Sequence, residues 1–220
     1  MCGKFTQKSS WKAVREYAAL LEPHARPDAI ETVTPMRFAS VICLDESGAR
    51  IVRPMRWGFA RMSAGAPGAR PDHIHARAET LDTKPTFREA FAERRGIVVV
   101  SSFNEAKELS QHKSAQYVIT PDDARPLGIA VLWERWSHPE HDELFTFVMV
   151  TVPANPLIAT ITDRMPAVLA PADWPLWLGE APATPETLTA VLRPYGGACS
   201  MTPEPSRTKA ARAATQPDLF

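Results

Sequence analysis

The sequence predicts an α+β fold in which antiparallel strands are wrapped by short helices. Apolar, strand-like segments at 117–120, 127–136 and 144–152 follow one another, separated by the polar turns PDDARP and SHPEHDE. The chain has 21 prolines in 220 residues, which favours many short elements over long helices. This length and pattern indicate one compact domain.

The first half of the chain is expected to contain a helix, a hairpin and a loop. Ser10 can cap a helix over 11–21, where apolar residues recur on one helical face. Residues 38–44 and 50–55 flank the turn DESG and predict a β-hairpin. The segment 61–72 is rich in Gly, Ala and Pro and is expected to be a loop.

The second half is expected to alternate strands with short helices. Residues 86–94 predict an amphipathic helix, because two phenylalanines stand four positions apart on one face. The run GIVVVSSF at 96–103 predicts a buried strand, and short helices are expected over 173–178 and 185–192.

Composition excludes several classes of protein. Basic and acidic residues number 25 each, so no global charge attracts nucleic acid or anionic membrane. A net charge of zero is still compatible with a local basic patch on the surface. Three cysteines without a C-x-x-C motif argue against a disulfide framework or a zinc ribbon and favour a reducing cytoplasm. No apolar stretch reaches membrane-spanning length. We expect no metal site, no cofactor and no phosphate-binding loop.

Cys2 is the first candidate for chemistry. Removal of the initiator methionine would place its α-amine beside its thiol, and both groups are partly deprotonated at neutral pH, with pKa values of about 8 to 8.5. The amine can condense with an aldehyde, and the thiol can then close a five-membered thiazolidine. Gly3 permits close backbone approach. The alternative is that a residue in second position has no function.

Two other residues have a functional and a structural interpretation. Glu105 follows the strand over 96–103, where a carboxyl group is either a general acid/base or simply solvated. Trp57, in PMRWGFA, either stacks on a DNA base or packs in the core.

Five segments, taken in order, resemble the motifs of the SRAP family (SOS-response-associated peptidase). They are MCGKF, PMRWGFA, HARAET, FREAFAERRGIVVVSSFNE and TVPANPLIATITDRMPAVL, and the resemblance extends from Cys2 to about Leu178. It implies one SRAP-like domain over 1–200, with antiparallel strands in a barrel-like core. A disordered tail is expected over 201–220, where large apolar residues are scarce.

The resemblance implies a sensor and shield for abasic sites in single-stranded DNA. In the family, the terminal cysteine attacks the ring-opened deoxyribose aldehyde and ends as a thiazolidine DNA–protein crosslink. The family members are also called peptidases, because removal of what precedes this cysteine frees it. The expected partner is therefore single-stranded DNA with abasic sites, and the expected state is a monomer without a cofactor or membrane.

Position by position, Cys2 matches the family nucleophile and Glu105 the glutamate that assists proton transfer. Lys4 stands where the family usually has arginine, which keeps the charge but not the bidentate guanidinium. The resemblance implies that the basic residues at these positions contact DNA phosphates independently of the base sequence. The DNA-binding residues implied are Lys4, Trp57, Arg77 and Arg164.

This chain departs from the family pattern at two expected catalytic positions. His75 replaces an asparagine, and Thr162 replaces a histidine that acts beside the sugar. Three interpretations stay open: His75 has taken over the acid/base role, the reaction is slower or altered, or His75 is a solvated surface residue. The segment 100–106 has also lost the proline, glycine and tryptophan of the family pattern.

The last five residues, QPDLF, are similar to the Q-x-x-L-F peptide that binds the bacterial sliding clamp. Gln216, Leu219 and Phe220 would make the contacts, with the last two as an apolar anchor on a flexible segment. The alternative is a chance pentapeptide.

Two rival functions belong to other classes. Cys2 could be the N-terminal nucleophile of a peptidase or amidase, which would need an oxyanion hole and a base. The chain could also bind single-stranded or branched DNA without crosslinking, since Thr162 cannot titrate.

Overall fold

The computed structural model describes residues 2–7, 31–60, 73–111, 113–138 and 141–204. The helix predicted over 11–21, the loop predicted over 61–72 and residues 205–220 of the predicted tail lie outside these ranges. Within the described residues, no helix is long and apolar enough to cross a membrane.

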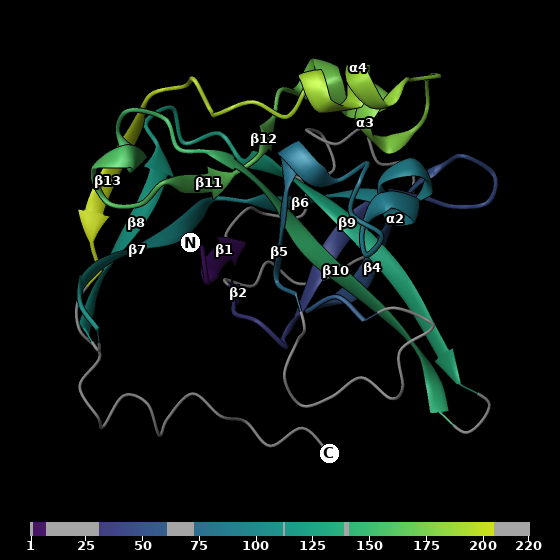
Figure 1. Cartoon of the computed structure of the whole chain (residues 1–220), viewed down its shortest axis with the longest axis horizontal. Coiled ribbons are helices and arrows are strands. Elements are labelled where there is room, and N and C mark those ends of the chain that lie inside the picture. Colours follow the sequence, from purple (N-terminus) through teal and green to yellow (C-terminus); the bar gives the residue numbers. More distant parts are fainter. Residues whose placement is uncertain (1, 8–30, 61–72, 112, 139–140, 205–220) are drawn as a thin grey trace.

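Five strands close into a barrel (Figure 1). Antiparallel pairing joins neighbours in the order β4 (Arg50–Trp57), β3 (Phe38–Leu44), β6 (Arg95–Val100), β9 (Leu127–His138) and β10 (His141–Pro153). A parallel pairing of β10 with β4 closes the ring. The predicted barrel-like core is therefore confirmed, although this one contact is parallel where antiparallel strands were expected.

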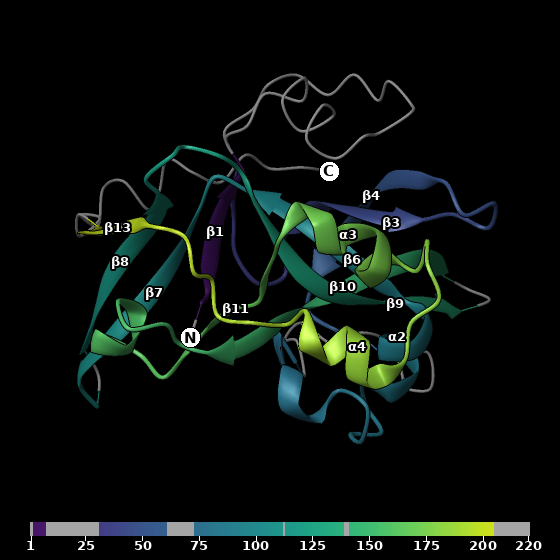
Figure 2. The same ribbon diagram turned by 90° about the horizontal axis from the view of Figure 1, so that it is seen from above.

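A second sheet lies beside the barrel (Figure 2). Its antiparallel strands are β13 (Cys199–Pro203), β8 (Lys113–Pro121), β7 (Ser102–Ser110), β1 (Lys4–Gln7) and β2 (Glu31–Val33), in that order. In both views the start of β1 lies close to β7, its neighbour in this sheet.

Short elements cover the rest of the barrel. The strand β5 (His75–Arg77) runs parallel to β10, β11 (Arg164–Pro166) runs antiparallel to β10, and β12 (Val168–Leu169) pairs with β9. The helices of the described residues are all short, as predicted. They are η1 (Ala78–Thr80), α2 (Arg88–Glu93), η2 (Ile158–Thr160), η3 (Pro171–Asp173), α3 (Trp174–Leu178) and α4 (Pro185–Ala190).

One apolar core joins the barrel to the second sheet. Every residue of β6 is buried, and Phe5 of β1 and Phe103 of β7 are buried in the same cluster as Trp57 of β4. Phe5 and Phe103 face each other across the β1–β7 pairing. Burying these aromatic side chains anchors β1, so the residue just before it has a defined place.

The structure confirms the hairpin, the strands and the short helices that the sequence predicts. The run over 96–103 is not one strand, however. It breaks at Ser101, whose backbone N–H and hydroxyl both donate to the Thr6 carbonyl at 2.9 Å. The break sends β6 into the barrel and β7 into the second sheet.

The C-terminal strand extends beyond the expected domain boundary at residue 200. Strand β13 pairs with β8 as far as Pro203, and the next residue, Glu204, donates its backbone N–H to the Gln116 carbonyl at 2.8 Å. Residues 201–204 therefore belong to the folded domain rather than to the tail.

Candidate active site

Cys2 lies just before β1 and is only 1% exposed. Its Sγ donates a hydrogen bond to the Lys4 carbonyl at 3.3 Å. Burial raises the pKa of the thiol strongly, and the nearby Glu105 charge raises it further, whereas the backbone N–H groups of Lys4 and Asn104 lower it. The thiol is therefore held protonated in a buried, hydrogen-bonded setting.

Glu105 lies in the middle of β7, opposite Tyr117 of β8, and is 1% exposed. The expectation that it follows a strand end was wrong because β7 begins at Ser102. Burial raises the pKa of Glu105 to about 7, against the opposing effects of the N-terminal positive charge and of the hydrogen bond from the Cys2 N–H. A carboxyl group that changes protonation near neutral pH thus lies beside the Cys2 nitrogen.

His75 contacts Cys2 directly. Its Nε2 lies 2.6 Å from the Cys2 carbonyl oxygen, so the ring nitrogen is the donor. Burial lowers the pKa of His75 to about 4, which keeps the imidazole neutral at physiological pH. The interpretation as a solvated surface residue is therefore wrong. The geometry favours a positioning residue for Cys2 over a proton-transfer group.

Substituting His75 tests this distinction. His75→Ala is expected to slow reaction at Cys2 by about 10- to 100-fold, because the Cys2 carbonyl loses its donor in a buried site. His75→Asn is expected to keep most of the rate, since an amide N–H can donate to the same carbonyl. The measurement is the rate of covalent capture of an abasic-site oligonucleotide. If the asparagine variant is as slow as the alanine variant, His75 transfers protons instead.

The expectation that Trp57 contacts DNA was wrong. The side chain is 0% exposed, and its indole N–H donates to the Ile74 carbonyl at 2.9 Å. Its ring packs against Phe5 at 5.2 Å between centroids and meets the edge of the His75 ring at 6.1 Å. Trp57 is a core residue that supports the position of His75, because no face of the indole is left for a base.

Arg164 was also expected to contact DNA, but its guanidinium is engaged within the protein. It is 8% exposed, forms a bidentate ion pair with Glu79 and donates from Nη2 to the Thr151 carbonyl at 2.6 Å. The same contact lowers the pKa of Glu79. In this conformation Arg164 joins β11 to β10 and η1, so a phosphate would have to displace Glu79.

Arg77 is exposed and remains suited to a phosphate contact. It stands two residues after His75 in β5, and alternation along a strand places both side chains on the same side. Lys4 is different, because its ammonium group is paired with the carboxylate of Glu204. Lys4 and Arg77 stay predicted DNA contacts.

Thr162 stands two residues before the start of β11 and is half-buried, and its backbone N–H donates to the Ile158 carbonyl at 3.0 Å. The next residue, Asp163, is exposed, and its charge contributes to the raised pKa of Glu105. The segment therefore influences the pKa of Glu105 through Asp163, a carboxylate that sequence reasoning did not single out. The catalytic role expected of Thr162 stays a prediction.

Sequence reasoning also missed Asn104 and Glu204. Asn104 is 2% exposed beside Glu105, and its amide donates to the Glu204 carboxylate at 3.3 Å. No local pattern marks Glu204, because its partners are 100 and 200 residues away along the chain. The clamp-binding residues Gln216, Leu219 and Phe220 lie outside the described residues. Within the described part of the chain, no group of three or more His, Cys, Asp or Glu side chains is arranged to hold a metal ion.

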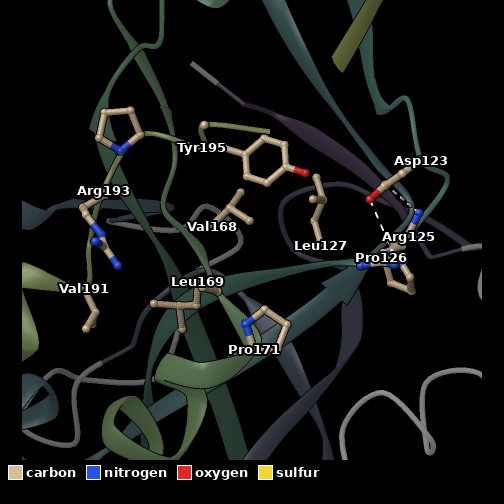
Figure 3. Close-up of a pocket in the computed structure, with 13 residues that line it drawn as sticks. Asp123, Arg125, Pro126, Leu127, Val168, Leu169, Pro171, Val191, Arg193 and Tyr195 are labelled. Atoms are coloured by element: carbon tan, nitrogen blue, oxygen red, sulfur yellow. Dashed lines mark hydrogen bonds and ion pairs between the residues drawn. The ribbon is translucent and has the colours of Figure 1, made fainter. Parts of the chain in front are cut away.

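A separate cavity of about 460 Å³ lies where β12 meets the segment 191–196 (Figure 3). Leu127, Val168 and Leu169 provide apolar lining. Arg125 and Arg193 also line it, but each pairs with an aspartate, at 3.7 and 3.0 Å. Its lining does not include Cys2, His75 or Glu105, so this cavity is distinct from the site at the N-terminus.

Comparisons with known proteins place the chain in a family. The family model described as SOS response associated peptidase (SRAP) matches residues 1–208. The chain is 31% identical over 197 residues to the abasic site processing protein YoqW of Bacillus subtilis, covering 89% of this chain and 88% of that protein. It is 27% identical over 187 residues to the abasic site processing protein YedK of Escherichia coli, covering 81% and 79%.

Solved structures agree on the fold. A crystal structure of a Bordetella bronchiseptica protein aligns with a TM-score of 0.76 at 22% identity, covering 93% of this chain and 100% of that one. A Bacteroides thetaiotaomicron protein aligns with a TM-score of 0.73 at 21% identity, covering 92% and 91%. With a family model that matches residues 1–208 and a relative 31% identical over most of both chains, the chain belongs to the SRAP family.

Proposed function

We propose that this protein captures abasic sites in single-stranded DNA through Cys2 and holds them as a thiazolidine crosslink. One observation carries the proposal: the nitrogen and the thiol of Cys2 lie together beside the Glu105 carboxyl group in a buried site. Family membership and relatives named abasic site processing proteins support the substrate class.

The reaction needs only an aldehyde and the two groups of Cys2. Removal of Met1 turns the Cys2 nitrogen into an α-amine, which attacks the aldehyde of the ring-opened deoxyribose. Loss of water from the resulting carbinolamine gives an imine. Sγ then bonds to the imine carbon, the π electrons move to nitrogen, and the thiol proton follows them. One water is released for each crosslink.

The neighbouring residues assist these steps. The Glu105 carboxylate takes a proton from the α-ammonium group and, once protonated, gives it to the departing hydroxyl. A pKa of about 7 suits both transfers near neutral pH. His75 orients Cys2 through its carbonyl. Arg77 binds a backbone phosphate, which positions the strand without reading its sequence.

The test is a single-stranded oligonucleotide with one abasic site, incubated with the protein and run on a denaturing gel. A heat-stable shifted band is expected. The control is the same oligonucleotide with a tetrahydrofuran site, which has no aldehyde and is expected to give no band. Retardation of both oligonucleotides on a native gel without a covalent band would favour the non-crosslinking binder. Neither binding nor a band would leave the peptidase or amidase as the better candidate.

The bacterial sliding clamp remains a second proposed partner. Only the sequence QPDLF supports it, and the crosslinking chemistry does not depend on it.

A further inference from the structure

Glu204 connects two neighbouring strands of the second sheet from the C-terminal end of the domain. Its carboxylate accepts hydrogen bonds from the Lys4 ammonium group through both oxygens and from the Asn104 amide through Oε2. Lys4 of β1 and Asn104 of β7 stand directly opposite each other in the antiparallel pairing. One carboxylate therefore holds together the side chains of a cross-strand pair.

The main chains of the same two residues contact the thiol of Cys2. Sγ donates to the Lys4 carbonyl at 3.3 Å. The backbone N–H groups of Lys4 and Asn104 both interact with the sulfur and lower the pKa of the thiol. Glu204 thus contacts the side chains of the residues whose main chains contact the nucleophile.

The contact is sheltered rather than fully exposed. The side chains of Lys4 and Glu204 are 20% and 22% exposed, and Asn104 is 2% exposed. Charge-assisted hydrogen bonds in such a setting restrain geometry more than surface ion pairs do. The Glu204 backbone is itself fixed by its bond to Gln116.

We propose that Glu204 is a positioning residue for the Cys2 thiol. By joining Lys4 to Asn104 it holds the main-chain segments that orient Sγ for ring closure onto the imine. For its DNA readout this inference rests on the proposed function. Because a small displacement of a reacting atom is costly, losing this restraint slows ring closure more than imine formation.

The variants are Glu204→Ala and Glu204→Gln, each prepared with Cys2 as the first residue and checked by intact mass. In the glutamine variant, an amide oxygen at the Oε2 position can still accept from both Lys4 and Asn104. The matched control is Glu180→Ala, which removes a similarly sheltered pair with Arg50, whose side chains are 16% and 27% exposed. Thermal unfolding compares the stability of all variants.

Two reactions are measured for each variant. In the first, a small aldehyde, glyoxylate, reacts without DNA, and cyanoborohydride separates reducible imine from thiazolidine by mass. In the second, the crosslinking rate is measured at saturating abasic-site DNA, alongside the Kd for an intact single strand. The glyoxylate reaction reports on the thiol even where the DNA reaction fails, so failure of this inference and failure of the proposed function are distinguishable.

Glu204→Ala is expected to slow thiazolidine formation about 10-fold in both reactions and to enrich the imine, with the Kd changed by less than about 3-fold. Glu204→Gln is expected to recover most of the wild-type rate, and Glu180→Ala to match wild type. An unchanged imine fraction in Glu204→Ala would overturn the inference. Faster crosslinking with tighter DNA binding would also overturn it, because Glu204 would then be competing with phosphate for Lys4.

Discussion

Replacing Cys2 by serine is expected to abolish the heat-stable crosslink while leaving imine formation intact. Serine keeps the α-amine after Met1 is removed, but its hydroxyl does not close a stable ring on the imine. The covalent band should therefore fall to the level seen without protein, and borohydride added during the reaction should restore it. The measurement is a denaturing gel of the abasic-site oligonucleotide with and without borohydride.

Two further variants make this result specific. Cys199→Ser removes the one cysteine that is only half-buried and is expected to behave as wild type. The second is a Cys2→Ser chain in which mass spectrometry shows that Met1 is retained. Its α-amine then belongs to Met1, one residue away from position 2, and little trapping is expected. A heat-stable band from Cys2→Ser without borohydride would show that another nucleophile forms the crosslink.

Replacing Glu105 by glutamine is expected to slow crosslinking by about 10²- to 10⁴-fold, the usual contribution of a general acid/base. Glutamine has nearly the same size and keeps an acceptor for the Cys2 N–H, so the loss reports proton transfer rather than packing. The rate at saturating DNA should fall much more than the affinity for an intact single strand. Both are measured on the same preparations.

The pH dependence of the crosslinking rate is a second test of the role of Glu105. Since the pKa of Glu105 is raised to about 7, lowering the pH below 7 protonates the carboxylate and removes the base that accepts the ammonium proton. The wild-type rate should therefore rise with pH through about 7, and Glu105→Gln should lack this inflection. Because burial lowers the pKa of His75 to about 4, His75 is not expected to contribute near neutral pH. An inflection that persists in Glu105→Gln would assign the titration to another group.

The strands of the barrel could be predicted because their apolar runs are long and local. The switch from β6 to β7 could not, because it depends on hydrogen bonds between Ser101 and Thr6, 95 residues apart. That switch decides whether Glu105 is a solvated strand end or a buried carboxyl group. The short strands β1, β5 and β11 were missed for a related reason, since three or four residues carry too little periodicity.

The site was predicted in part. The sequence named Cys2, Glu105 and His75 as candidates, and the structure shows that His75, 73 residues from Cys2, contacts it through a direct hydrogen bond. The sequence did not reveal the partners of Trp57 and Arg164, because residue type alone does not show what a side chain pairs with. The carbonyl of Ile74 satisfies the indole, and Glu79 occupies the guanidinium. Both partners come from the segment around β5, whose fold the sequence pattern did not indicate.

Intact mass of the DNA–protein complex is the most direct test of the central claim. Wild-type protein is incubated with the abasic-site oligonucleotide, and borohydride is added only after the reaction. The intact mass of the complex is then measured by mass spectrometry. The expected complex has the mass of the protein without Met1 plus the mass of the oligonucleotide minus one water, with no hydrogens added by the reductant. A complex that retains Met1, one that gains two hydrogens as an imine would, or the absence of any complex would contradict it.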